Sequence, residues 1–189
     1  MMSNFEQDLA QSKKTVAFIS SFLLNEGLLN FIDIREPSES CVHPPDIKIH
    51  LEPTIYIEVK EDAMSMKTGN IYLEHRALKE FSLVCVDESA LPLLMIVPYV
   101  NPRPLLFFLS DEFRQELIQG LKEGIVRVVN GGDHGGLGYI ITEKNARLMT
   151  SCVTGQFFTD SQLDEFEEKF INEFFHSENH FFMKYVDFQ

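Results

Sequence analysis

Near the N-terminus, apolar side chains recur at the spacing of an α-helix. These residues are separated mostly by three, four or seven positions: Phe5, Leu9, Val16, Ile19, Phe22 and Leu23. Ser3, with Glu6 three residues later, has the capping-box pattern of a helix start. We therefore expect a helix over residues 4–26 that ends at Gly27.

Two segments of alternating apolar and polar residues follow a polar loop. The first reads DIKIHL from Asp46, and the second reads TIYIEVK from Thr54. Alternation with a period of two is typical of a β-strand with one buried face. The pattern predicts two strands joined at Glu52-Pro53, as a hairpin.

The middle of the chain is its most apolar part. Residues 91–100 (LPLLMIVPYV) and 103–110 (RPLLFFLS) are almost continuously hydrophobic, which is typical of buried strands. We expect them to form the middle of a sheet. Ser110 is then expected to cap a helix that ends near Gly124, because acidic residues fill its first turn.

The last third combines strand, turn and helix patterns. IVRVV and LGYIIT are expected to be strands around the glycine-rich turn NGGDHGG, and Thr159 with Gln162 forms a second capping box. The helix that this box opens has an apolar side: Leu163, Phe166, Phe170, Ile171 and Phe174. The segment 67–81 fits a strand or a helix, and both remain open.

This order of elements predicts an α/β (α+β) fold, a three-layer domain with a mixed central sheet flanked by helices. With 189 residues, 44% of them apolar, the chain can build one compact core. We expect a domain over residues 1–155 and an acidic, Phe-rich C-terminal helix over 156–189. That helix would pack on the domain or at a dimer interface.

Composition limits the function classes. A net charge of −13 argues against a broad, non-specific grip on nucleic acid, which needs clustered Lys and Arg. The chain has no apolar run long enough for a membrane span and no signal-peptide pattern, so a soluble, cytoplasmic protein is expected. Cys41, Cys85 and Cys152 form no CxxC pair and are expected to be reduced and mostly buried.

Three residues of the predicted hairpin have the chemistry of a metal site. Asp46 begins the first strand, and Glu58 and Lys60 occupy alternate positions of the second, so both project from one face. A hairpin can bring Asp46 beside them. Two carboxylates supply the hard oxygen ligands that Mg²⁺ prefers, and the backbone carbonyl of Val59 is a further candidate ligand.

The same set suits phosphodiester hydrolysis. A carboxylate-bound metal ion neutralises charge on phosphoryl oxygens and lowers the pKa of a bound water. Lys60 either orients or activates the attacking water, or stabilises developing negative charge as a fixed cation.

The residues Pro45-Asp46, Glu58-Val59-Lys60 and the TGNIYLE segment from Thr68 to Glu74 resemble the PD-(D/E)xK nuclease superfamily. The resemblance is to small nucleases of phage or mobile-element type and covers roughly residues 5–145. It implies a restriction-endonuclease-like fold, a divalent metal such as Mg²⁺ or Mn²⁺, and cleavage of DNA. It also implies that Asp46 and Glu58 are metal ligands, Lys60 the catalytic lysine and Glu74 an accessory acid.

Other polar residues have simpler explanations. Glu6 fits the capping box better than a metal site, and Glu26 is expected to be solvated. Gly69 and Asn70 form either an ordinary turn or one that aims Glu74 at the site. We expect Asp133 and His134 in a plain hairpin loop, His176 and His180 away from any metal, and the Phe stripe in the core or a dimer contact.

Two classes of function follow. The first is a Mg²⁺-dependent endonuclease that acts on DNA, with a homodimer as one way to address two strands. The second is a catalytically silent protein of the same fold that binds a protein partner through its acidic surface. The sequence does not distinguish DNA from RNA as the substrate of the first.

Overall fold

The computed structural model describes residues 4–25, 32–34, 45–131 and 136–175. Its helices are α1 (Asn4–Asn25), α2 (Ser65–Thr68), α3 (His75–Asp87), α4 (Asp111–Glu123), α5 (Glu143–Phe157) and α6 (Asp160–Phe170), the last continued by a π-helical turn over Ile171–Phe175. Its strands are β1 (Ile32–Ile34), β2 (Ile47–Ile49), β3 (Ile55–Asp62), β4 (Asn70–Glu74), β5 (Leu91–Pro98), β6 (Leu105–Phe108), β7 (Val126–Gly131) and β8 (Gly136–Thr142).

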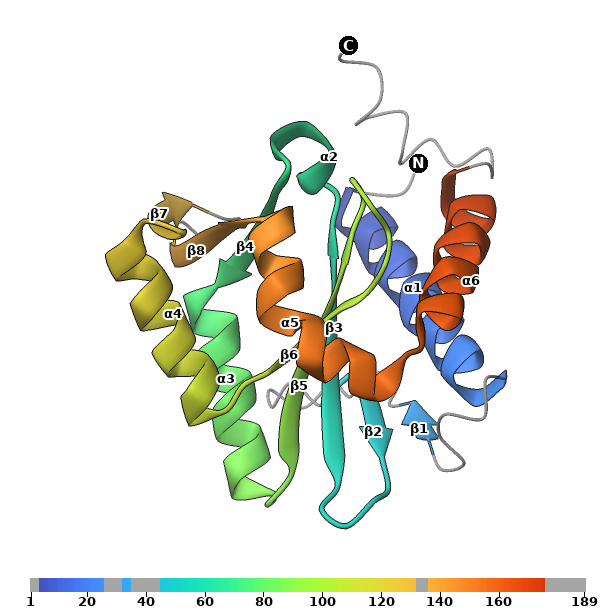
Figure 1. Cartoon of the computed structure of the whole chain (residues 1–189). Helices are drawn as coiled ribbons and strands as arrows, with labels where there is room; N and C mark the ends of the chain where they lie inside the picture. The colour runs from blue at the N-terminus through green and yellow to red at the C-terminus, as the bar shows by residue number, and fades with distance from the viewer. Residues whose placement is uncertain (1–3, 26–31, 35–44, 132–135, 176–189) are drawn as a thin grey trace.

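The strands form two sheets. The larger has the order β1-β2-β3-β5-β6, with β3 and β5 parallel and the other neighbours antiparallel. The smaller is antiparallel, in the order β4-β8-β7. Figure 1 shows α1 and α6 on one side of the large sheet, and the small sheet with α3 and α4 on the other. The mixed α/β, three-layer class expected from the sequence is confirmed.

One core lies between the large sheet and the helices α1 and α6. Phe166, Phe170 and Phe174 are fully buried there. The Phe18 ring of α1 meets all three edge-on, at centroid distances of 5.3 to 5.7 Å. The Phe stripe of the C-terminal helix is therefore part of the core in the described portion of the chain.

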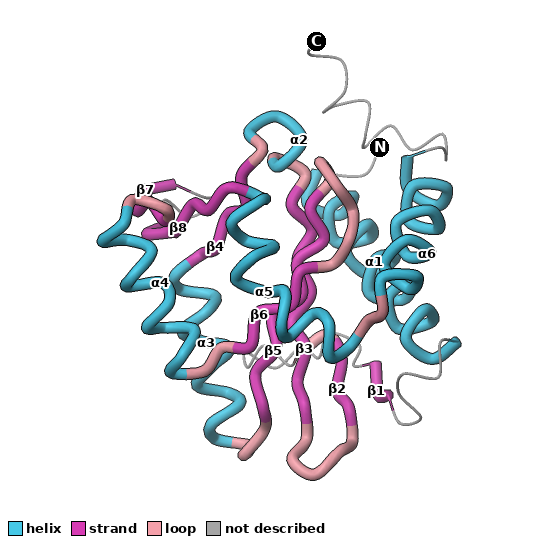
Figure 2. The backbone as a smooth tube through the Cα atoms, in the orientation of Figure 1, coloured by secondary structure: helices cyan, strands magenta, loops and turns pink. Residues whose placement is uncertain are grey.

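A second core lies between the large sheet and the small one. Leu94 and Ile96 of β5 pack there against Ile71 and Leu73 of β4 and against side chains of α4, α5 and β8. Helix α5 passes along the open edge of β6, as the tube in Figure 2 shows, and Thr154 Oγ1 accepts a hydrogen bond from the Leu106 backbone N–H at 3.2 Å. The helix thus links the two cores.

Several local expectations are confirmed. The hairpin of β2 and β3 forms, Ser110 caps α4, Gly124 ends it with φ 74°, and Thr159 and Gln162 make both bonds of a capping box. The open segment resolves into a short helix, a strand and a helix: α2, β4 and α3. Within the described ranges, no helix is both long and apolar enough to cross a bilayer.

Three expectations need correction. Of residues 103–110, only 105–108 form a strand, β6, which is an edge strand and not the middle of the sheet. The strands β4, β7 and β8 make a sheet of their own, and α5 was not predicted. Cys152 is exposed, whereas Cys85 is buried as expected. Glu26, Gly27, Cys41, Asp133, His134, His176 and His180 lie outside the described residues.

The packing of α6 predicts that its aromatic residues stabilise the fold. Phe166→Ala should lower the free energy of unfolding by about 3–5 kcal/mol, because it removes a fully buried ring. Leu148→Ala, at a position 66% exposed, should change it by less than about 0.5 kcal/mol. Urea unfolding followed by circular dichroism measures both. Equal, small effects would mean that α6 is not part of the core.

Candidate metal and nuclease site

The register of β2 against β3 brings Asp46 to Glu58. Ile47 is paired with Ile57, so the next antiparallel pair along the hairpin is Asp46 with Glu58. Residues that face each other across two strands project from the same side of the sheet. Asp46 Oδ2 also accepts a hydrogen bond from the Val59 backbone N–H at 2.8 Å, which holds the carboxylate at the end of β2.

Alternation along β3 adds the lysine. Glu58 and Lys60 lie on one face of the strand, and Lys60 Nζ donates to Glu58 Oε1 at 2.6 Å. The Glu58 side chain is 21% exposed and that of Lys60 50%, so the ammonium group reaches solvent while the carboxylate is set deeper. The structure therefore brings Asp46, Glu58 and Lys60 together, as the sequence predicts.

The charges of this cluster act on one another. Burial, together with the negative charge of Glu58, raises the pKa of Asp46 to about 6, although the Val59 hydrogen bond and Lys60 oppose the rise. For Lys60, burial lowers the pKa, but the charges of Glu58, Asp46 and Glu74 outweigh it and leave the pKa above its usual value. Two close carboxylates thus create a strongly negative site with one cation beside it.

Glu74 approaches the site from the small sheet. It is the last residue of β4 and the N-cap position of α3, and its negative charge contributes to the raised pKa of Lys60. The start of β4 is fixed by Asp62 at the end of β3. Asp62 Oδ2 accepts from the Tyr72 backbone N–H and Oδ1 from the Ser65 backbone N–H, both at 3.0 Å.

The turn between α2 and β4 needs its glycine. Gly69 has φ 63°, the left-handed conformation that ends a helix, and its N–H donates to the Ser65 carbonyl at 2.8 Å. The Asn70 N–H then donates to Thr68 Oγ1 at 3.2 Å. These contacts set the direction in which the chain enters β4, the strand that ends at Glu74.

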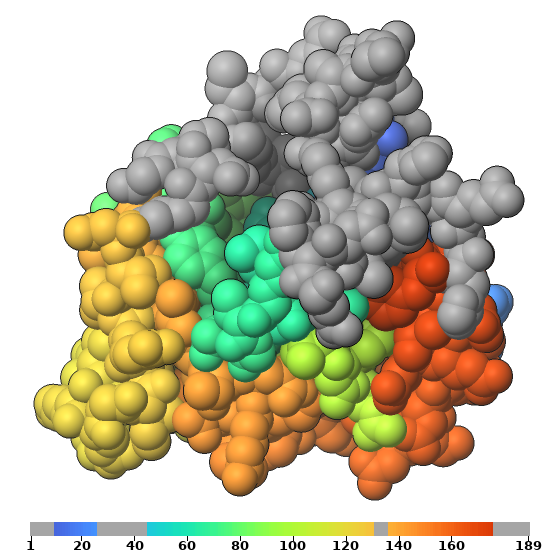
Figure 3. Space-filling model, turned by 90° about the horizontal axis from the view of Figure 1, so that it is seen from above, coloured from blue at the N-terminus to red at the C-terminus, as the bar shows by residue number. Residues whose placement is uncertain are grey.

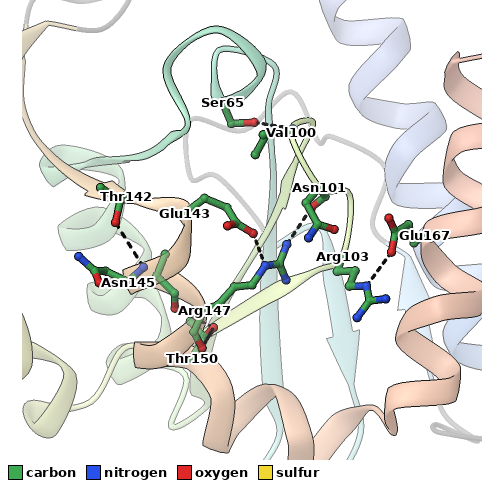
Figure 4. Close-up of polar contacts among 11 residues, drawn as sticks. Ser65, Val100, Asn101, Arg103, Thr142, Glu143, Asn145, Arg147, Thr150 and Glu167 are labelled. Atoms are coloured by element: carbon green, nitrogen blue, oxygen red, sulfur yellow. Dashed lines mark hydrogen bonds and ion pairs between the residues drawn. The ribbon is translucent and has the colours of Figure 1, made fainter.

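Polar contacts, most of them partly buried, hold the β5–β6 connection against α2, α5 and α6 (Figure 4). The Val100 N–H donates to Ser65 Oγ at 3.1 Å, and Ser65 Oγ donates in turn to the Asp62 carbonyl at 2.6 Å. Arg147 of α5 donates to the Asn101 carbonyl at 2.9 Å, and Arg103 pairs with Glu167 of α6 at 2.6 Å. The β5–β6 connection is therefore tied to α2, α5 and α6 at once.

Glu61 lies on the opposite face of β3 and was not among the residues expected from the sequence to have a role. Its carboxylate lies beneath α1 and accepts hydrogen bonds from Tyr99 Oη and, at 3.4 Å, from Gln11 Nε2. Burial raises the pKa of Glu61, and these hydrogen bonds partly offset the rise. The sequence contains one clue to its burial. Glu61 occupies the same face of the strand as Ile57 and Val59, and both of these residues are apolar.

A cleft of about 930 Å³ opens onto the cluster. The upper end of the molecule is shown in Figure 3, where α2 lies between α4 and α6. Residues of β3, β4, β5, β7 and β8 line the cleft, together with parts of α1, α2 and α3. Among its lining residues are Glu58, Lys60, Asp62, Thr68, Asn70, Tyr72, Glu74, Val129, Asn130 and Ile140.

The donors present fit a divalent metal ion. Within residues 4–25, 32–34, 45–131 and 136–175, no three His, Cys, Asp or Glu side chains form a ready-made cage. Asp46 and Glu58 nevertheless supply two carboxylates side by side. The Val59 carbonyl leaves the same edge of β3 as its N–H, which faces Asp46. A few oxygen ligands completed by water are what Mg²⁺ accepts.

The remaining predicted candidate, Glu6, belongs to α1, but its side chain lies outside the described part of the structure. The α1 residues that line the cleft are Gln11 and Ser12, which the sequence did not single out.

Comparison with solved structures finds proteins with a similar arrangement of helices and strands. No family model and no curated protein matches the chain. A Holliday junction resolvase from the archaeal hyperthermophile Archaeoglobus fulgidus is 15% identical, covers 77% of this chain and 99% of its own, and has a TM-score of 0.45.

A nuclease from a fusselovirus is 10% identical, covers 92% of this chain and 98% of its own, and has a TM-score of 0.41. At these identities and TM-scores, the likeness is one of element arrangement alone. The likeness does not by itself extend to the chemistry of the site.

The raised pKa of Asp46 predicts that stability depends on pH. Between the unfolded value of 3.8 and the folded value of about 6, the folded chain binds more protons, so the free energy of unfolding falls as pH rises through this range. Asp46→Asn abolishes this titration, while the amide oxygen can still accept from Val59.

In EDTA the variant should therefore exceed the wild type by about 2 kcal/mol near pH 7 and match it near pH 4. Urea unfolding at several pH values measures the difference. A difference that does not change with pH would contradict the assigned environment of Asp46.

Proposed function

We propose that this protein is a metal-dependent nuclease that hydrolyses phosphodiester bonds within DNA. The observation that carries the proposal is the convergence of Asp46, Glu58 and Lys60 beside a cleft that is lined by Glu58 and Lys60 and, from a second sheet, by Glu74. The first three residues come from one local hairpin, and Glu74 comes from a separate layer. In a surface hairpin with unrelated charges, there would be no reason for a carboxylate of another sheet, such as Glu74, to line the same cleft.

Each residue has a separate task. Asp46 and Glu58 hold the cation with their carboxylate oxygens, and the Val59 N–H keeps Asp46 turned toward the site. The ion, once bound, neutralises phosphoryl charge and lowers the pKa of a water molecule. Lys60 lies beside Glu58 and donates hydrogen bonds to the attacking water or to a phosphoryl oxygen as negative charge develops.

Glu74 completes the site as an accessory acid. Its charge favours the protonated form of Lys60, and its position on β4 fixes the far wall of the cleft. Asp62 acts through the backbone of β4 and is a positioning residue. Mn²⁺, which accepts similar oxygen ligands, is expected to replace Mg²⁺.

A homodimer would let two sites address two strands. Phe166, Phe170 and Phe174 are buried in the core, so a dimer contact through the C-terminal region would use other side chains.

Lys60 separates metal binding from catalysis. Lys60→Ala should lower the rate of DNA cleavage by roughly a hundredfold or more, the size expected for loss of one preorganised electrostatic or proton-transfer group. Lys122→Ala, at an exposed lysine of α4, is the matched control and should cleave at the wild-type rate. Cleavage of circular and linear DNA, with RNA in parallel, provides the readout.

If Lys60→Ala cleaves as fast as the wild type, the catalytic role of the lysine is wrong. If the wild type binds metal but cleaves no nucleic acid, the protein is a catalytically silent binding protein.

Metal binding has its own signature. Mg²⁺ should raise the melting temperature, because a ligand that binds only the folded chain stabilises it. Glu58→Gln should lose most of this increase, since an amide is a poorer ligand than a carboxylate. Lys60→Ala, which removes no oxygen donor, should retain the increase. Equal responses of all three proteins would contradict the proposed ligands.

A further inference from the structure

The outer face of β4 carries a tyrosine beside the proposed site. Ile71 and Leu73 point into the core, so Asn70, Tyr72 and Glu74 project from the opposite face. Tyr72 is two residues from Glu74, which along a strand is about 7 Å. Both side chains line the same cleft as Glu58 and Lys60.

A glycine on the neighbouring strand makes room for the ring of Tyr72. Gly138 of β8 pairs with Glu74, diagonally across from Tyr72. Any side chain at position 138 would overlap with the Cε2, Cζ and Oη atoms of Tyr72. The ring therefore lies against the backbone of β8, and the Asp62 carboxylate fixes its main chain through the Tyr72 N–H.

The cleft carries too little positive charge to bind a duplex through its phosphates. Among the residues that line the cleft in the described part of the chain, Lys60 alone is basic, against the acids Glu58, Glu61, Asp62 and Glu74. Affinity for duplex DNA through its backbone requires several Lys or Arg contacts. Stacking of bases on aromatic rings supplies affinity that does not depend on such contacts.

The size of the cleft leads to the same conclusion. Its volume of about 930 Å³ is that of a site for a small organic molecule. A double helix, whose major groove alone is about 12 Å wide, is too large to enter such a space and would lie across its opening. A few unstacked nucleotides can, with a base against Tyr72 and the apolar side chains of Val129 and Ile140 nearby.

We infer that the cleft takes an unpaired segment of a nucleic acid strand and that Tyr72 is the platform on which one of its bases stacks. The inference rests on the proposed nuclease function and names its substrate class: single strands, or the unpaired parts of branched or frayed duplexes. The stacked base holds the strand, and the adjoining phosphate lies at Glu58 and Lys60.

The test compares binding with cleavage. Binding of a fluorescein-labelled oligothymidine of fifteen nucleotides, and of a blunt duplex of fifteen base pairs, is measured by anisotropy in Ca²⁺, with the probes checked for integrity on a gel. Tyr72→Leu keeps an apolar side chain without a π-face, and Tyr72→Phe keeps the aromatic ring. Melting temperatures verify that each variant is folded.

We expect the wild type to bind the single strand at least about tenfold more tightly than the duplex, and Tyr72→Leu to raise the Kd for the single strand about tenfold. Tyr72→Phe, which keeps a ring of the same size, should stay close to the wild type. Equal binding of both probes, or a Tyr72→Leu variant that binds the single strand normally, would overturn the inference.

These outcomes are distinct from failure of the nuclease proposal. Metal-dependent cleavage of duplex DNA, with no effect of Tyr72→Leu, would retain the nuclease and discard the stacking platform. Ring-dependent binding of the single strand without cleavage under any metal would retain the platform and discard the nuclease.

Discussion

The site depends on the register between β2 and β3. β2 is only three residues long, and beyond Ile47 the Asp46 carboxylate, rather than another strand pair, accepts from the Val59 N–H. A slip of one residue would turn Asp46 to the opposite face of the sheet, because side chains alternate along a strand. The buried Ile47 and Ile49 oppose such a slip, since it would expose them. The geometry of the carboxylate pair is therefore set by the hydrophobic core.

β3 serves both layers of the molecule. Glu58, Lys60 and Asp62 face the small sheet, whereas Val59 and Glu61 face α1. Asp62 and the turn at Gly69 then direct the chain into β4, so the end of one sheet determines where the other begins. This junction therefore fixes the main chain of Tyr72 next to the strand that carries Glu58 and Lys60.

Local patterns predicted the hairpin and the proximity of its three candidate site residues, because alternation and a short connection act within about fifteen residues of chain. Helix α5 was not predicted for a physical reason. Its buried positions are Ala146, Thr150 and Thr154, small or polar residues where an amphipathic helix usually has large apolar ones. Thr150 satisfies its hydroxyl within the helix by donating to the Ala146 carbonyl, and Thr154 bonds to β6.

The second sheet depends on contacts that no local pattern contains. β4 and β8 are separated by more than sixty residues of sequence, and only their pairing places Gly138 beneath Tyr72. Glu61 is similar, because its partners Gln11 and Tyr99 come from α1 and from the end of β5. The sequence thus identifies the candidate side chains of the site, whereas the residues around them become visible only in the fold.

The contact between α5 and β6 also affects how the molecule meets its own copies. An open strand edge presents backbone groups to which a strand of another molecule can add, a common start of aggregation. Here the Leu106 N–H, which would serve such a strand, is occupied by the hydroxyl of Thr154. Because the helix lies along this edge, sheet extension from molecule to molecule is blocked at β6.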